Sequence, residues 1–220
     1  MGLDGHVSAW SAIVPVKPLD SAKSRISGER AEAELLAVAF LRDTLEALRR
    51  SQSVADIVVA TSDRRIAHLC QGAGCVVVDD SATPGINAAV HAAAQACQGD
   101  HPVLALVSDL PALDPSTVDR VVSLAAGLPR SFMPDASGHG TTMWCAAAPE
   151  LVETSFGPDS AARHAAAGAV DLAAEGGADL WRARQDVDTP EDLQRVLALG
   201  VGLHTRSVLD FEVSTVPAAE

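Results

Sequence analysis

A chain of 220 residues, 48% hydrophobic and 20% charged, can bury a substantial core in one large domain, which excludes a disordered or fibrous protein. Its 29 acidic and 16 basic residues give a net charge of −13, which repels phosphate backbones and anionic lipids. No run approaches the roughly 20 apolar residues of a transmembrane helix. The opening MGLDGHVSAW shows neither a basic leader nor a secretory apolar stretch.

Cysteine usage points to a reducing compartment. The four cysteines are scattered and form no C-x-x-C pair: Cys70, Cys75, Cys97 and Cys145. Free thiols of this kind are typical of small buried apolar residues in a reducing cytosol, rather than of metal ligands or nucleophiles. We therefore expect a soluble cytoplasmic globular protein without a nucleic-acid or membrane partner.

Apolar runs of strand length alternate with segments of helical period through the first half of the chain. The predicted strands are residues 11–16, 54–61, 75–78 and 103–107, and the predicted helices are residues 32–50, 63–71, 86–97 and 115–126. The first helix is expected to bury one stripe, formed by Leu35, Val38, Leu41, Leu45 and Leu48. Asp114 and Pro115 provide an N-cap and a first helical residue for the fourth helix. Unbroken apolar strands joined by helices predict a parallel sheet with right-handed crossovers.

The second half changes character. Residues 131–134 and 141–148 are predicted strands, and the turn DASGHG between them indicates an inserted hairpin. The loop FGPDS, a short helix, a strand near residues 180–187 and a last helix with a T-x-x-D cap at Thr189 follow. The prediction is one α/β domain over residues 1–220, with a mainly parallel central sheet, helices on both faces and a core at about residues 8–202. Residues 203–220 are left unassigned.

A cationic segment follows the first predicted strand. The chain has two lysines, Lys17 and Lys23, and both lie in VPVKPLDSAKSR together with Arg25. Ligands of parallel α/β sheets bind beyond the carboxyl ends of the strands, where this segment lies. The segment suits a polyphosphate, because lysine and arginine bind phosphate oxygens through charge-assisted hydrogen bonds. The alternative is a solvated surface loop.

Three carboxylates are candidates for binding a hard cation. Asp109 ends the strand VLALVSD, and Asp186 and Asp188 in DVDTP precede the last helix. Carboxylate oxygens on two strand ends would bracket one Mg²⁺ ion, which prefers oxygen ligands. Two alternatives stay open: Asp109 accepts N–H groups of its own loop, and Asp188 acts only as a local helix cap.

Two short segments would serve as anion sites. Gly140, Thr141 and Thr142 offer hydroxyl and N–H groups after a flexible turn, and FGPDS leads into a helix that begins near Ser160. A plain N-cap is the alternative role of Ser160. The sequence contains no H-E-x-x-H, Cys/His zinc spacing, G-x-S-x-G, Walker lysine motif or G-x-G-x-x-G. Zinc sites, α/β-hydrolases, P-loop NTPases and nicotinamide dehydrogenases are therefore disfavoured.

Four motifs taken together carry a family resemblance over roughly residues 11–200: VPVKPLDSAKSRI, SDLPAL, FGPDSAARH and DVDTPEDL. In this order they resemble the guanylyltransferases of coenzyme F-420 biosynthesis, which join phosphoenolpyruvate or 2-phospho-L-lactate to GMP taken from GTP. These enzymes belong to a wider group of Rossmann-like nucleotidyltransferases that includes the molybdopterin-guanylyl and sugar-nucleotide enzymes. Many members of the wider group have a Gly-rich opening loop, and the Pro/Lys form found here favours the narrower family.

The resemblance implies a role for each matching residue. Residues expected along the GTP phosphates are Lys17, Lys23 and Arg25, with Asn87 in PGINAAV near the nucleotide. Asp109 and Asp188 are expected to hold Mg²⁺, with Asp186 as a supporting partner or a ligand. Residues expected to contact the phosphoacid are Thr141, Gly157 and Ser160. The product would pass to the next enzyme of the pathway.

The implied mechanism is a direct in-line displacement. A phosphate oxygen of the acceptor, already ionised near neutral pH, attacks the α-phosphorus and pyrophosphate leaves, so no general base is needed. Two alternatives remain open: the same chemistry on a molybdopterin or sugar phosphate, and a nucleotide-binding module without catalysis. The sequence does not separate phosphoenolpyruvate from 2-phospho-L-lactate.

Overall fold

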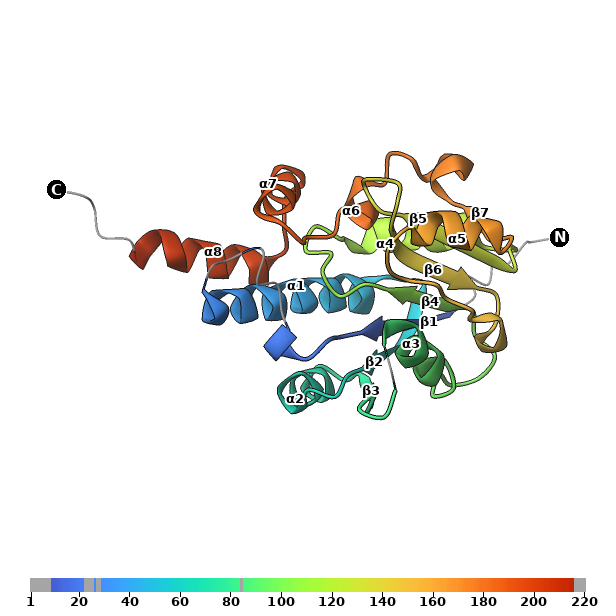
Figure 1. Ribbon diagram of the computed structural model, residues 1–220, viewed down its shortest axis with the longest axis horizontal. Coiled ribbons are helices and arrows are strands. Elements are labelled where there is room, and N and C mark those ends of the chain that lie inside the picture. Colours follow the sequence, from blue (N-terminus) through green and yellow to red (C-terminus); the bar gives the residue numbers. More distant parts are fainter. Residues whose placement is uncertain (1–8, 22–25, 27–28, 84, 216–220) are drawn as a thin grey trace.

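A seven-stranded sheet forms the centre of the molecule in the computed structural model, which describes residues 9–21, 26, 29–83 and 85–215 (Figure 1). The strands follow the order β3-β2-β1-β4-β6-β5-β7, and only β6 runs antiparallel to its neighbours. Their bounds are β1 Trp10–Pro15, β2 Val54–Ala60, β3 Val76–Val78, β4 Val103–Leu106, β5 Arg130–Pro134, β6 Thr141–Ala146 and β7 Val170–Asp171. The predicted mainly parallel sheet with an inserted β5–β6 hairpin is confirmed.

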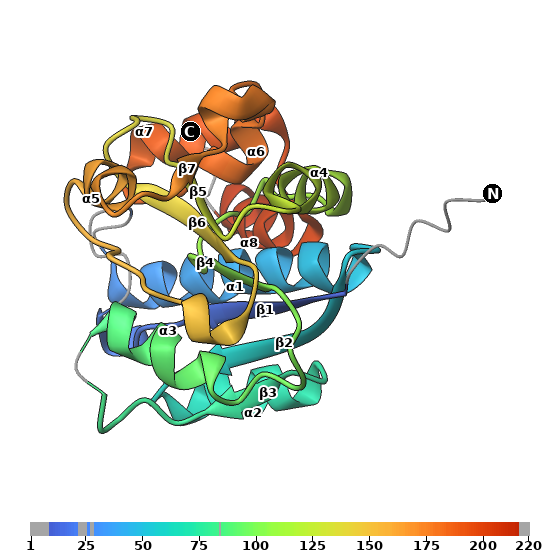
Figure 2. The ribbon, with the colours of Figure 1, turned by 90° about the vertical axis from the view of Figure 1, so that its right-hand side faces the viewer.

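Helices cover both faces of this sheet. Their bounds are α1 Arg30–Arg50, α2 Arg64–Gly72, α3 Ile86–Ala94, α4 Pro115–Ala125, α5 Ser160–Ala166, α6 Trp181–Arg184, α7 Pro190–Leu199 and α8 Leu203–Thr215. Three short turns also occur: η1 Leu19–Ser21, η2 Pro149–Leu151 and η3 Ala173–Gly177. Helices α3 and α5 pack on one face, and α1, α2 and α4 pack on the other. Figure 2 shows α3 and α5 to the left of the sheet and α4 to the right.

The two faces are made by alternation along each strand. In β1, Ala12 and Val14 join the core under α1 and α4, whereas Ile13 between them joins the core under α3 and α5. In β6, Met143 belongs to the core under α1 and α4, whereas Trp144 belongs to the core under α3 and α5. All five of these side chains are buried, so apolar neighbours along a strand serve the cores on opposite faces of the sheet.

The predicted helix starts at Asp114 and Thr189 are confirmed. Asp114 Oδ1 accepts the N–H of Thr117 at 2.8 Å. Thr189 Oγ1 accepts the N–H of Asp192 at 3.2 Å, while the Asp192 carboxylate accepts the Thr189 N–H at 3.0 Å, which completes a capping box.

The predicted strand at residues 180–187 is wrong. Residues Trp181–Arg184 form the single turn α6, and the edge of the sheet beside β5 is occupied by β7. Arg184 donates to the carbonyl oxygens of Pro134 (3.2 Å) and Asp135 (3.0 Å) and lies 4.9 Å from the ring of Trp181. These side-chain bonds to the end of β5 hold the segment as a turn, which local apolar alternation does not reveal.

The buried surface of α1 also differs from the predicted stripe. Leu41, Leu45 and Leu48 pack against the sheet as expected, but Leu35 is 57% exposed. Leu36 and Phe40 are buried instead, in a separate cluster that includes Val196 of α7 and Val208 of α8. Helix α1 therefore packs on two partners, the sheet and the C-terminal helices, and it lies beside α8 in Figure 1.

The thiol groups of the cysteines are buried or partly buried. All four cysteines are free thiols, and burial raises the pKa of Cys70 and Cys145 to about 12, so these thiols stay protonated. Across the described residues, no helix is long and apolar enough to cross a bilayer.

Candidate active site

A cleft of about 1090 Å³ opens at the carboxyl edge of the sheet. The parallel strands end there, and antiparallel β6 begins there. Lys17 after β1, Ser62 after β2, Asp80 after β3 and Asp109 after β4 line it beside Thr141, the first residue of β6. The remaining lining includes residues 156–160, Asp186 and Asp188. One cleft therefore brings together the residues expected to bind phosphate (Lys17), metal (Asp109 and Asp188) and the phosphoacid (Thr141, Gly157 and Ser160). The predicted phosphate residues Lys23 and Arg25 lie outside the described residues.

The acidic part of the cleft is formed by two chain segments. Asp109 follows β4 and is partly buried, while Asp186 is partly buried and Asp188 exposed before α7. The N-terminus of α7 is capped by Thr189 and Asp192, so the capping role considered for Asp188 belongs to its neighbours. Among the described residues no group of three or more His, Cys, Asp or Glu is arranged to hold a metal ion. Two carboxylates still fit Mg²⁺, which commonly takes one or two carboxylates and completes its shell with substrate phosphates and water.

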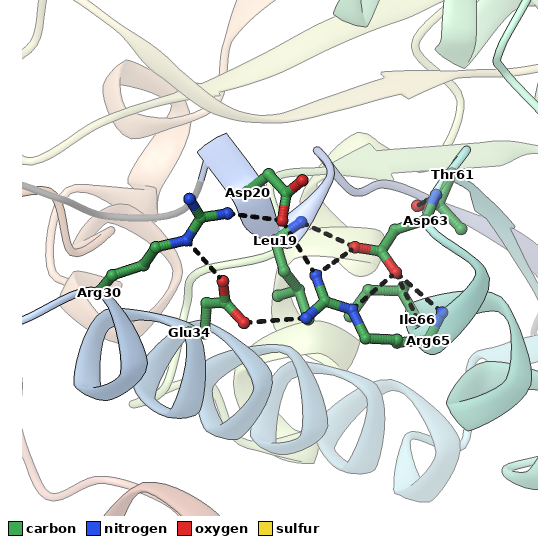
Figure 3. A network of polar contacts seen from close by, with 8 residues as sticks. All are labelled: Leu19, Asp20, Arg30, Glu34, Thr61, Asp63, Arg65 and Ile66. Carbon is green, nitrogen blue, oxygen red and sulfur yellow. Dashed lines mark hydrogen bonds and ion pairs between the residues drawn. The ribbon is translucent and has the colours of Figure 1, made fainter.

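A polar network fixes the chain just after Lys17 (Figure 3). The N–H of Leu19 in η1 donates to Asp63 Oδ2 at 2.9 Å, and Arg65 binds the same carboxylate at 3.1 Å. Arg65 also binds Glu34 at 2.9 Å, and Arg30 binds Asp20 at 2.7 Å and Glu34 at 3.1 Å. The network ties η1 to the starts of α1 and α2, and thereby orients the segment that carries Lys17.

Asp63 is the buried centre of this network. Burial raises its pKa, but hydrogen bonds from Arg65 and from the N–H groups of Leu19, Arg65 and Ile66 outweigh burial and lower the pKa to about 2. The carboxylate therefore stays ionised near neutral pH. Most of the other ion pairs are exposed to solvent, which screens them, so the buried Asp63 carboxylate holds η1 more firmly than they do.

The loop before α5 is held by two side chains, one from α3 and one from α5. Asn87 donates to the carbonyl oxygen of Phe156 (3.1 Å) and accepts its N–H (2.7 Å), and Arg163 binds the carbonyl oxygens of Ser155 and Pro158. Asn87 follows Gly85 and Ile86, which line the cleft, and its own hydrogen bonds hold this loop; its predicted nucleotide contact stays a prediction. Gly157 has φ +121°, which L side chains rarely adopt, so glycine is needed at this position of the cleft wall.

Two hydroxyl groups and one imidazole meet at the wall of the cleft. Ser160 Oγ lies 3.0 Å from Thr141 Oγ1, which lies 3.0 Å from His164 Nδ1. The N–H of Ser155 donates to His164 Nε2 at 2.8 Å. The structure thus brings together two predicted phosphoacid residues and adds His164, which the sequence analysis quoted in FGPDSAARH without assigning it a role.

The start of α5 differs from the predicted anion site. Asp159, in a left-handed conformation with φ 53°, occupies the N-cap position, so the alternative of Ser160 as a plain N-cap is wrong. The N–H of Ser160 donates to the carbonyl oxygen of Gly157 (3.1 Å) and that of Ala161 to His139 (3.0 Å). Because these two N–H groups have partners within the chain, this helix end does not offer them to an anion.

Residues 22–183 match the model of the MobA-like NTP transferase domain. The chain belongs to this family. Among its relatives, the phosphoenolpyruvate guanylyltransferase of Streptomyces coelicolor is 44% identical over 205 residues, covering 90% of this chain and 95% of the relative. That of Thermomonospora curvata is 40% identical over 215 residues, covering 96% and 93%.

Solved structures agree on the fold of this MobA-like NTP transferase. A protein from Desulfovibrio desulfuricans G20 assigned as a nucleotide-diphospho-sugar transferase superposes with a TM-score of 0.65 at 16% identity, over 94% of this chain and 96% of that one. A 4-diphosphocytidyl-2C-methyl-D-erythritol synthase superposes with a TM-score of 0.57 at 14% identity, over 87% and 99%. The Rossmann-like nucleotidyltransferase fold is confirmed.

The cleft also contains polar residues to which the sequence motifs did not point. The additional lining residues with polar side chains are Ser62, Asp80, Ser81, Thr83, Asp135 and His139. Ser62 and Asp80 lie directly beyond predicted strands, so the rule that ligands bind past the carboxyl ends of strands would have found them. Asp135 and His139 lie in the hairpin turn, whose return to this edge depends on the antiparallel direction of β6.

The stability of this MobA-like NTP transferase is expected to depend on pH through His164. Burial, with a smaller contribution from the charge of Arg163, lowers the pKa of His164 from 6.5 to about 4. As the pH falls from 6.5 towards 4, the unfolded chain binds this proton first, so the free energy of unfolding decreases by at most about 3 kcal/mol. Above pH 6.5, His164 contributes no pH dependence to the free energy of unfolding. Urea unfolding across this pH range measures the effect.

A matched pair of histidine variants isolates that slope. His164→Asn removes the titrating ring and is expected to flatten the decrease, while His68→Gln on the exposed side of α2 leaves it unchanged. Equal slopes in the wild type and in His164→Asn would contradict the assignment.

Proposed function

We propose that the chain transfers GMP from GTP to the phosphate of phosphoenolpyruvate, releases pyrophosphate, and acts in coenzyme F-420 biosynthesis. The carrying observation is that Lys17, Asp109 and Asp188 share one cleft with the Thr141–Ser160 hydroxyl pair. The family and the 44% identity to a phosphoenolpyruvate guanylyltransferase support it. A volume of about 1090 Å³ has room for a nucleotide and a three-carbon acid side by side.

The reaction needs charge control more than proton transfer. One phosphate oxygen of phosphoenolpyruvate forms a bond to the α-phosphorus of GTP, and the bond from that phosphorus to the bridging oxygen breaks, so pyrophosphate leaves. Both reactants are anions, and their repulsion must be offset while they are held in line. In this proposal Lys17 neutralises nucleotide phosphate charge, and the hydroxyl pair orients the acceptor.

Asp109 and Asp188 would hold Mg²⁺ in this proposal. Bound there with nucleotide phosphates completing its shell, the ion would neutralise charge on the triphosphate. The chain supplies these carboxylates beside regular elements, because Asp109 lies in the loop just after the central strand β4 and Asp188 precedes the capped start of α7.

Pyrophosphate release tests the proposal. With Mg²⁺, GTP and phosphoenolpyruvate, we expect one pyrophosphate per product whose mass equals GTP plus phosphoenolpyruvate less pyrophosphate. Parallel reactions with 2-phospho-L-lactate and with a sugar 1-phosphate compare acceptors, and ATP and CTP compare donors. Turnover with a sugar phosphate but not with either phosphoacid would favour the sugar-nucleotide alternative, and nucleotide binding without turnover would favour a non-catalytic module.

A further inference from the structure

His164 is held in one place and one orientation. The residue is 1% exposed, and its ring lies among Trp144, Phe132 and Phe156 at centroid distances of 4.6, 5.6 and 5.9 Å. Three aromatic rings and two hydrogen bonds therefore surround the imidazole. A buried imidazole in an apolar surround is disfavoured as a cation, so the ring is neutral and carries one proton.

The position of that proton follows from a backbone group. The N–H of Ser155 points at His164 Nε2 over 2.8 Å, and a backbone N–H only donates, so Nε2 has no proton. The single proton is therefore on Nδ1, and Nδ1 donates to Thr141 Oγ1 at 3.0 Å. The chain fixes the tautomer through Ser155, one residue before the Phe156 that Asn87 anchors.

The fixed tautomer determines what the hydroxyl pair offers to the cleft. Thr141 Oγ1 accepts the Nδ1 proton of His164, so neither hydroxyl group donates its own proton to the imidazole. The two hydroxyl groups have two protons and share one across their 3.0 Å hydrogen bond. One proton is left to donate into the cleft that both residues line. The opposite tautomer would accept a proton from Thr141 and remove this donor.

We propose that His164 is a positioning residue that sets the Thr141–Ser160 pair as a hydrogen-bond donor to an anionic oxygen of the phosphoacid acceptor. The inference rests on the proposed function for the identity of the acceptor. A carboxylate or a non-protonated phosphate oxygen only accepts hydrogen bonds, so a net donor is the matching partner for either end of phosphoenolpyruvate. The imidazole itself does not touch the substrate.

Two isosteric variants separate this role from packing. In His164→Asn the side-chain amide N–H₂ replaces Nδ1 as the donor to Thr141, whereas in His164→Gln the amide oxygen replaces Nε2 as the acceptor from Ser155. Both variants lose the ring and its aromatic contacts, so both are expected to melt at a lower temperature by similar amounts. Only His164→Gln is expected to weaken the binding of phosphoenolpyruvate. Its Kd and KM should rise by roughly 10-fold, which is the loss expected for one hydrogen bond. The KM for GTP stays the same in both.

The measurements are titration calorimetry with phosphoenolpyruvate and steady-state kinetics with each substrate varied. Equal losses in the Asn and Gln variants, or no loss in either, would overturn the positioning role. Inorganic phosphate and pyruvate, titrated separately, show which end of the acceptor the pair meets, because only the ligand that carries that end loses affinity in His164→Gln.

Nitrogen NMR of ¹⁵N-histidine-labelled wild type provides a readout independent of activity and of variant folding. We expect one histidine with a protonated Nδ1 and a bare Nε2 from about pH 5.5 to 8, with its two ring shifts unchanged across that range. A protonated Nε2 would overturn the inference even in an active enzyme. If the tautomer is as stated but the wild type neither binds nor consumes phosphoenolpyruvate, the proposed function fails, and the assignment of the acceptor fails with it.

Discussion

Replacing Asp109 with Asn is expected to lower kcat by roughly 100- to 1000-fold while the fold persists. Asn has nearly the same shape as Asp but no charge, so the change removes a cation ligand at the point where phosphate charge must be offset. Thr44 of α1 helps to hold the backbone around residue 109, because its Oγ1 accepts the N–H of Leu110 at 3.2 Å and lies 3.4 Å from the carbonyl oxygen of Ser108.

A matched control is available on the same chain. Asp100 is exposed in the turn before β4, at the opposite edge of the sheet from the cleft, so Asp100→Asn is expected to keep wild-type turnover. Circular dichroism and the melting temperature verify that both variants are folded. Full activity of Asp109→Asn, or full wild-type activity in the presence of a chelator, would show that no metal acts through this carboxylate.

Replacing Asp43 with Ala is expected to destabilise the chain by about 2–4 kcal/mol and to release α8 from α1. Asp43 is a buried carboxylate in the middle of α1, 5% exposed, and its two oxygens accept the N–H groups of His204 (3.0 Å) and Thr205 (2.9 Å) at the start of α8. Hydrogen bonds to a charged group are stronger than neutral ones, and both donors would lose their partner. Urea unfolding measures the stability, and hydrogen exchange measures the local release.

Glu46→Ala, one turn further along α1, is the control. Glu46 forms only a partly exposed ion pair with Arg49 at 2.8 Å, so its removal is expected to change stability by no more than about 1 kcal/mol. Amide exchange in residues 204–210 should accelerate in Asp43→Ala and not in Glu46→Ala. Unchanged protection of these amides in Asp43→Ala would show that α8 is held by its apolar contacts alone.

Much of the fold follows from local physical signals. The strands β1, β2 and β4 are unbroken apolar runs, and two helix starts are marked by side chains that cap their own N–H groups, Asp114 and Thr189. Strand ends are also local features, so the sequence located the cleft edge at Lys17 and Asp109. The family resemblance selected Thr141 and Ser160 from several comparable hydroxyl residues.

Residues far apart in the chain decided the rest. Residues 180–184 form a turn because Arg184 finds the carbonyl oxygens at the end of β5, and α8 begins where Asp43, about 160 positions earlier, caps it. Gly202 is required beside it because a Cβ there would overlap the Asp43 carboxyl group.

The same distinction applies to the site. The sequence determined the composition and approximate place of the cleft, since strand ends and charged residues are encoded locally. Only the tertiary structure decided that Asn87 holds the loop at Phe156, and that His164 meets Thr141. A hydrogen bond depends on distance and direction between two groups, and those are set when the sheet, α3 and α5 pack together, not by the spacing of residues along the chain.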